Sequence, residues 1–131
     1  MTLDGLVSCL SSHGPGETMD RFVAAVAERG MTILARIDHA GAAAKVGMEL
    51  RPTEVVLFGN PKAGTPLMQA MQTIGIDLPL KALVWQDADG KTWLSYNDPK
   101  WLVERHGIPA GMERTLGAMA DVLAAIAKAA T

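Results

Sequence analysis

The chain has 131 residues, of which 49% are apolar and 20% are charged, and its formal net charge is −2. This length and composition are typical of a globular protein with a hydrophobic core that needs no disulfide or metal. The nearly neutral charge, with no run of Lys or Arg, argues against a nucleic-acid or anionic-membrane partner.

Strands and helices are expected to alternate along most of the chain. Apolar periodicity and turn residues predict strands at 5–10, 31–37, 54–58, 80–86 and 91–96. The same signals predict helices at 15–29, 40–46, from 65 onward, 99–106 and 112–128, with Pro109 separating the last two. Asp89-Gly90 is the turn of a hairpin. The resulting order, β-α-β-α-β-α-β-β-α-α, predicts a single domain over residues 1–131. Its class is α/β (α+β), a mixed sheet of about five strands with helices packed on it.

The sequence carries few signals for an oxidising compartment or a membrane. Cys9 is the one cysteine, so it has no internal disulfide partner, and its apolar neighbours favour a buried, unreactive thiol. The N-terminal residues lack a basic segment followed by a long apolar one, and no apolar stretch is long enough to span a bilayer. We therefore expect a cytoplasmic protein with no membrane partner.

Three polar clusters, at 59–66, 77–81 and 96–99, each follow or precede an apolar run, which indicates a site on the rim of a sheet. The first cluster is expected to join a buried strand to a helix that starts at Thr65. Free backbone N–H groups at a helix start favour an anion, Gly59 and Gly64 permit close approach of a ligand, and Lys62 adds positive charge. The alternative is a tight turn in which Thr65 is only a cap.

The spacing Gly59-x4-Gly64 imitates the beginning of a P-loop. A P-loop continues with Lys and then Ser or Thr, but Thr65 and Pro66 occupy those positions. We therefore do not expect nucleotide hydrolysis of the P-loop kind.

The other polar residues each have a functional and a structural interpretation. Asp77 and Lys81 flank the mouth of a strand, where a buried lysine could act as a base or nucleophile, but an ion pair that fixes the loop is favoured. Asp38 and His39 resemble part of an acid–base pair, but Asp38 as the cap of the 40–46 helix is favoured. Asn97 or Asp98 is expected to cap the helix that follows.

No metal or cofactor is expected. His13, His39 and His106 lack the spacing of metal ligands, and no cysteine pair assists them. The chain has eight methionines, and Met19, Met68, Met71 and Met119 fall on inward helix faces, which favours core filling over haem or copper binding.

The motifs together resemble those of a family of small bacterial and archaeal proteins, domain-of-unknown-function family 302. The segments that carry the resemblance cover nearly the whole chain: 17–21, 35–39, 50–54, 58–68, 77–81 and 96–99. The resemblance implies an α/β fold and a homodimer. It implies no established activity.

The leading hypothesis is a cytoplasmic, homodimeric domain that binds a small anionic ligand at the strand-to-helix loop 59–66. Its predicted ligand-binding residues are Gly59, Asn60, Lys62, Gly64, Thr65, Asp77, Lys81, Asn97 and Asp98. One alternative is an enzyme that uses Lys81, Asp38 or His39 as base or nucleophile. The other is a structural or partner-binding domain whose polar motifs are only caps and turns.

Overall fold

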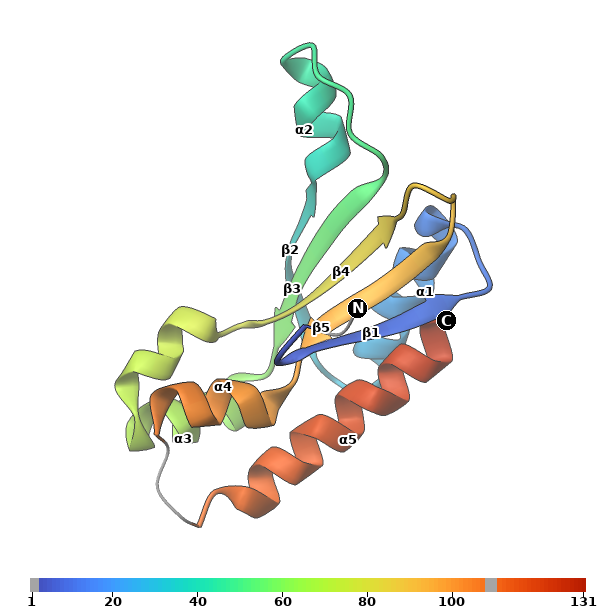
Figure 1. The fold of residues 1–131 in the computed structure, drawn as a ribbon. Coiled ribbons are helices and arrows are strands. Elements are labelled where there is room, and N and C mark those ends of the chain that lie inside the picture. Colours follow the sequence, from blue (N-terminus) through green and yellow to red (C-terminus); the bar gives the residue numbers. More distant parts are fainter. Residues whose placement is uncertain (1–2, 108–110) are drawn as a thin grey trace.

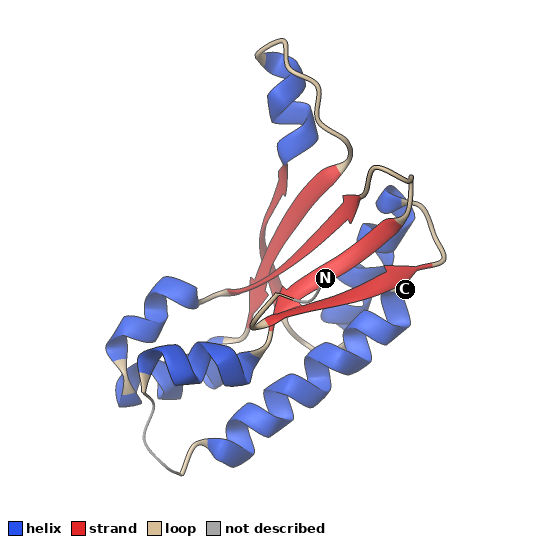
Figure 2. Cartoon of the chain, viewed as in Figure 1, coloured by secondary structure: helices blue, strands red, loops and turns tan. Residues whose placement is uncertain are grey.

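The computed structural model describes residues 3–107 and 111–131, which fold around one five-stranded sheet (Figures 1 and 2). The strands are β1 (Leu6–Ser11), β2 (Thr32–Asp38), β3 (Thr53–Gly59), β4 (Leu80–Gln86) and β5 (Thr92–Asn97). Their order across the sheet is β1-β5-β4-β3-β2. The helices are α1 (Pro15–Glu28), α2 (His39–Lys45), α3 (Pro61–Ala70), α4 (Pro99–His106) and α5 (Glu113–Ala130), with a 3₁₀ helix η1 (Gln72–Asp77).

The predicted fold class and the order of the elements along the chain are confirmed, but the expectation of a mixed sheet is wrong. All four neighbouring strand pairs are antiparallel. A strand–helix–strand pattern suggests a parallel crossover, in which the helix packs across a face of the sheet. Here α2 extends beyond one end of the sheet and α3 with η1 lies at the other end (Figure 1), so each connection returns the chain as a long hairpin.

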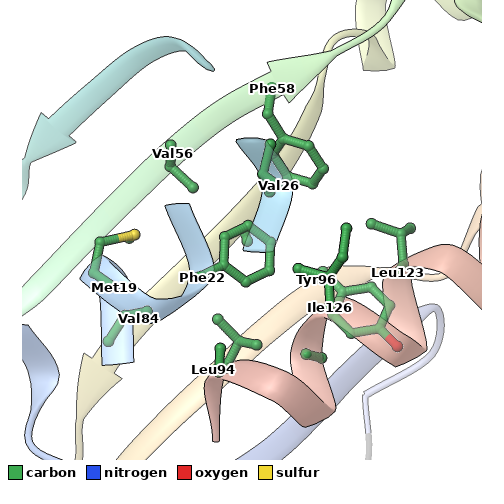
Figure 3. Close-up of a cluster of buried hydrophobic side chains, with 13 residues drawn as sticks. Met19, Phe22, Val26, Val56, Phe58, Val84, Leu94, Tyr96, Leu123 and Ile126 are labelled. Carbon is green, nitrogen blue, oxygen red and sulfur yellow. The ribbon is translucent and has the colours of Figure 1, made fainter. Parts of the chain in front are cut away.

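The hydrophobic core lies between one face of the sheet and helices α1 and α5. Alternate strand residues such as Val56, Phe58 and Leu94 point toward these helices, and all three are fully buried. Phe22 of α1 lies against Phe58 edge to face, with ring centroids 5.3 Å apart (Figure 3). Full burial of such a side chain stabilises the fold by about 1.5–3 kcal/mol, so this layer fixes α1 and α5 on the sheet.

Cys9 lies on β1 beside this core. It is partly buried, and burial raises the pKa of its thiol. A raised pKa keeps the thiol protonated and weakly nucleophilic near neutral pH. The interpretation of Cys9 as an unreactive side chain is consistent with this environment.

The opposite face of the sheet is not covered by any helix of the described chain. We call it the open face. It is unusually apolar for a solvated surface, with Leu6, Leu10, Ala35, Ile37, Val55, Leu57, Leu83, Trp85 and Trp93 interrupted by Ser8, Lys81, Ser95, Asn97 and Thr53.

The aromatic residues of the open face are held in place by polar contacts. The rings of Trp85 and Trp93 stack with centroids 6.1 Å apart. Trp85 Nε1 donates to Ser95 Oγ at 2.9 Å, and Trp93 Nε1 donates to Asp87 Oδ2 at 2.9 Å. The bond from Trp93, followed by backbone N–H groups, lowers the pKa of the Asp87 carboxyl. The open face is therefore an ordered surface.

The start of the third helix differs from the expectation. The third helix starts at Pro61 and not at Thr65, because the side chain of Asn60 caps it by accepting from Lys62 N at 2.9 Å. Pro66 consequently lies inside the helix.

The expected role of Asp38 is confirmed, since its Oδ1 accepts from Gly41 N at 2.9 Å at the start of α2. Pro109 lies outside the described residues.

Candidate functional site: an apolar cavity at the end of the sheet

The described chain contains a cavity of about 840 Å³, which we call the apolar cavity. It lies where α3 and the chain entering β4 approach the N-terminal half of α5 and the adjoining ends of β2 and β3. Its lining includes Leu34, Met68, Leu78, Pro79, Leu80, Met119, Val122 and Leu123. Ligand pockets in proteins commonly measure about 300–1,000 Å³ and are mostly apolar, so this cavity has the size and surface of a small-molecule site.

The polar cluster at 59–66 forms one wall of the apolar cavity. Gly59, Asn60, Gly64 and Thr65 all line it. Added Cβ atoms at Gly59 and Gly64 would lie 3.7 Å from Pro79 and 3.6 Å from Leu78, at ordinary contact distance. Neither glycine has a positive φ, so their contribution to this wall is the absence of a side chain and not an unusual backbone conformation.

The backbone N–H groups at the start of α3 are already engaged within the helix. Lys62 N donates to the Asn60 side chain, and the amides of Ala63 and Gly64 donate to the Asn60 carbonyl at 2.9 and 3.0 Å. Pro61 has no N–H to offer. These three donors, which were expected to bind an anion, are therefore occupied, which favours a side chain as the partner of a negative group in the cavity.

Arg114 is the charged side chain of the apolar cavity. Of the described residues that line it, no other is charged, and none is acidic. Arg114 lies in the first turn of α5, next to Thr115, which also lines the cavity. The sequence analysis missed both residues, because no local pattern links the start of this helix to the segment 59–66.

Asp77 pairs with residues of α4 and not with Lys81. Its carboxylate accepts from Arg105 Nη1 at 3.0 Å and bonds to His106 Nε2, and His106 Nδ1 lies 3.0 Å from Thr73 Oγ1. The side chains of Asp77 and His106 are 12% and 7% exposed. The pairing with Lys81 is therefore wrong, and Asp77 instead joins η1 to α4.

Lys81, His39 and Asn97 lie in a second, smaller hollow of about 390 Å³ on the open face. Lys81 and Asn97 come from β4 and β5, and His39 starts α2. Asp38, the proposed partner of His39 in catalysis, is engaged as the cap of α2. Asp98 caps α4 by accepting from Lys100 N at 3.0 Å.

The structure thus divides the predicted ligand-binding residues among several places. Gly59, Asn60, Gly64 and Thr65 share the apolar cavity. The side chain of Lys62 is exposed and is not part of the cavity lining. Among the described residues, no group of three or more His, Cys, Asp or Glu side chains could hold a metal ion.

Comparison with known proteins places this chain in a family. The sequence profile of the family described as "Domain of unknown function DUF302" matches residues 7–126. A solved structure, described as an uncharacterized conserved DUF302 protein from Bacillus stearothermophilus, superposes with a TM-score of 0.87. It is 21% identical in sequence, and the match covers 98% of this chain and 100% of that one. The chain belongs to the DUF302 family, as its motifs suggested.

Curated relatives share only part of their length with this chain. Proteins named "Fluoride-specific ion channel FluC 1" from Brucella suis and Brucella abortus are 45% identical over 115 residues. These matches span 88% of this chain but 45% and 43% of the relatives, so the chain corresponds to less than half of each. No helix in the described ranges 3–107 and 111–131 has the length and hydropathy needed to cross a membrane.

Proposed function

We propose that this protein is a cytoplasmic, homodimeric domain that binds a small anionic molecule in the apolar cavity beside residues 59–66. The observation that carries the proposal is the cavity itself. It has the volume of a ligand site, its wall includes Gly59, Asn60, Gly64 and Thr65, and Arg114 provides a positive charge at its edge.

Ligand binding can be tested by a thermal-shift screen of metabolites against the wild-type protein and a variant with a filled cavity. Ala118 lines the cavity and is exposed, so Ala118→Phe should fill the space without disturbing the core. Ala124 is also exposed on α5 but lies outside the cavity, which makes Ala124→Phe the matched control.

We expect at least one anionic compound to raise the Tm of the wild type and of A124F but not of A118F. The absence of any hit, or hits that bind A118F equally well, would contradict the proposal.

The open face supports the homodimer. Antiparallel sheets that face water usually carry polar residues on the solvated side, whereas this face presents Val55, Leu83 and two tryptophans. Contiguous apolar surface of this kind marks an interaction site. A two-fold dimer would bury the open face of each subunit against its own copy.

A second candidate function is suggested by the name of the Brucella relatives. Because they are named as fluoride-specific channels and contain a segment 45% identical to this chain, the domain could sense fluoride for such a channel. A fluoride sensor should show amide chemical-shift changes in sodium fluoride that are absent in sodium chloride of equal ionic strength. Identical spectra in the two salts would exclude it.

A further inference from the structure

The walls and the charge of the apolar cavity together restrict the class of ligand. Most of the lining is hydrocarbon or thioether, as at Met68, Leu78 and Met119. A compact anion such as phosphate would leave these walls in contact with water. A pure hydrocarbon would contact these apolar walls but would form no ion pair or hydrogen bond with Arg114.

Arg114 is poorly placed for the stability of its own helix. It lies in the first turn of α5, where the helix dipole favours negative and not positive side chains. The neighbouring Glu113 does not neutralise the cavity, because it accepts from Gly111 N at 2.7 Å and is not among the lining residues. Arg114 is also exposed to solvent, so an anionic ligand can reach its guanidinium.

We propose that the ligand is an amphiphilic carboxylate with a long hydrocarbon chain. This proposal rests on the proposed function and names its ligand class. The guanidinium of Arg114 holds the carboxylate, which matches its planar pair of donors, and the Thr115 hydroxyl lies on the same turn to donate as well. The chain occupies the space among Met68, Leu78 and Met119.

The methionines fit a flexible chain. Met31, Met68 and Met119 all line the apolar cavity. Methionine is unbranched and polarisable, so it adapts to irregular or variable apolar ligands. A cavity bordered by three of them favours a hydrocarbon chain over a rigid, hydrogen-bonding ring system.

The test uses the neutral fluorophore N-phenyl-1-naphthylamine, which reports the apolar cavity irrespective of charge. Octanoate and decanoate, and the matching alcohols, compete for the bound fluorophore in the wild type, R114Q and K128Q. Lys128 lies at the far end of the same helix, is exposed and does not line the cavity. K128Q is therefore the matched control, because it also removes one positive charge but at a position outside the cavity.

We expect decanoate to bind more tightly than decanol, and each added methylene to strengthen binding roughly threefold to fourfold. R114Q should weaken the affinity for decanoate by roughly tenfold or more, as expected for the loss of a charged hydrogen bond. Decanol binding should not change in R114Q, and K128Q should behave as the wild type.

The outcomes separate this proposal from the proposed function. If decanol binds as well as decanoate, or if R114Q and K128Q have equal effects, the ligand class is wrong while the cavity remains a binding site. If neither the fluorophore nor octanoate nor decanoate binds the wild type, the ligand class is wrong, and the proposed function is then decided by the metabolite screen with A118F and A124F. If decanoate binds A118F as tightly as A124F, its site lies outside the apolar cavity and the proposal is overturned.

Discussion

Gly5 shows how a single residue fixes the position of a helix that lies far from it in the sequence. Its φ is +74°, and a Cβ built at this position would lie only 2.3 Å from the Trp101 ring of α4. The carbonyl of Gly5 also accepts from Asp98 N at 2.8 Å, at the cap of α4. The start of the chain and α4 are therefore joined at a place where only glycine fits.

We predict that Gly5→Ala lowers the free energy of unfolding by about 2 kcal/mol or more, since it adds a steric overlap to the roughly 1–2 kcal/mol of a left-handed backbone. Gly30→Ala is the matched control, because Gly30 has the same φ of +74° with nothing within 4 Å of its Cβ position. Gly30→Ala should lower the free energy of unfolding by only about 1 kcal/mol. Urea unfolding measures both, and equal losses would show that the contact with Trp101 is unimportant.

At the scale of the elements, the cluster around Asp77 joins two segments that are far apart in the sequence. Asp77 belongs to η1, and Arg105 and His106 belong to the last turn of α4. Leu67, Ile74 and Leu116 form a small buried cluster close by. The polar contacts of Asp77 and this apolar cluster together position α3 and η1. Because α3 forms one wall of the apolar cavity, they also position that wall.

We predict that Asp77→Ala lowers the free energy of unfolding by about 2–3 kcal/mol, because it leaves a nearly buried His106 without its charged partner. Arg105→Gln should lower it by less than about 1 kcal/mol, since Arg105 is 52% exposed and its ion pair is screened by water. The two variants remove opposite members of one cluster. A larger loss in R105Q than in D77A, measured by urea unfolding, would reverse the assigned importance of the two contacts.

The elements also show where the sequence was sufficient for prediction. Helix and strand positions follow from apolar periodicity and from local caps such as Asp38 and Asp98, whose partners lie two or three residues away. The antiparallel sheet was not predictable in this way, because the placement of α2 and α3 at the ends of the sheet, and not across one of its faces, depends on contacts between distant segments.

The same reasoning explains the partial success at the candidate site. The 59–66 segment was identified because its glycines and prolines are conspicuous in one stretch of sequence. Arg114 and Thr115 reach the same cavity from a helix about 50 residues later. Asp77 pairs with Arg105, which lies 28 residues later in the sequence. No local pattern in the sequence predicts this pairing.

At the scale of the whole molecule, two features lack a partner within the chain that the structure describes. The open face exposes an apolar sheet surface, and α2 with the segment after it extends beyond the end of the sheet (Figure 1). Val46, Met48 and Leu50 on this extension are 72%, 66% and 49% exposed. Apolar side chains this exposed on a projecting arm are typical of residues that contact another subunit.

The open face and the arm of α2 together offer about the area that a stable dimer needs at its lower limit. Strand spacing and rise give the sheet face a flat footprint of roughly 500 Å². The relief of its side chains and the arm of α2 bring this close to the roughly 600 Å² per subunit that the lower limit of a stable interface requires. The pattern of the face favours a second copy, because one surface of mixed Trp, Leu and Ser residues can meet itself across a two-fold axis.

We predict that the wild type behaves in light scattering at micromolar concentration as a particle of twice the 13.9 kDa chain mass. Leu83→Lys should yield a folded monomer, because Leu83 lies on the central strand β4 and a lysine there would bury an unpaired charge in the dimer while remaining solvated in the monomer. Ala124→Lys, on the exposed side of α5, should remain dimeric. A wild type of single-chain mass across a dilution series, or an L83K protein that stays dimeric, would show that the open face is not the interface.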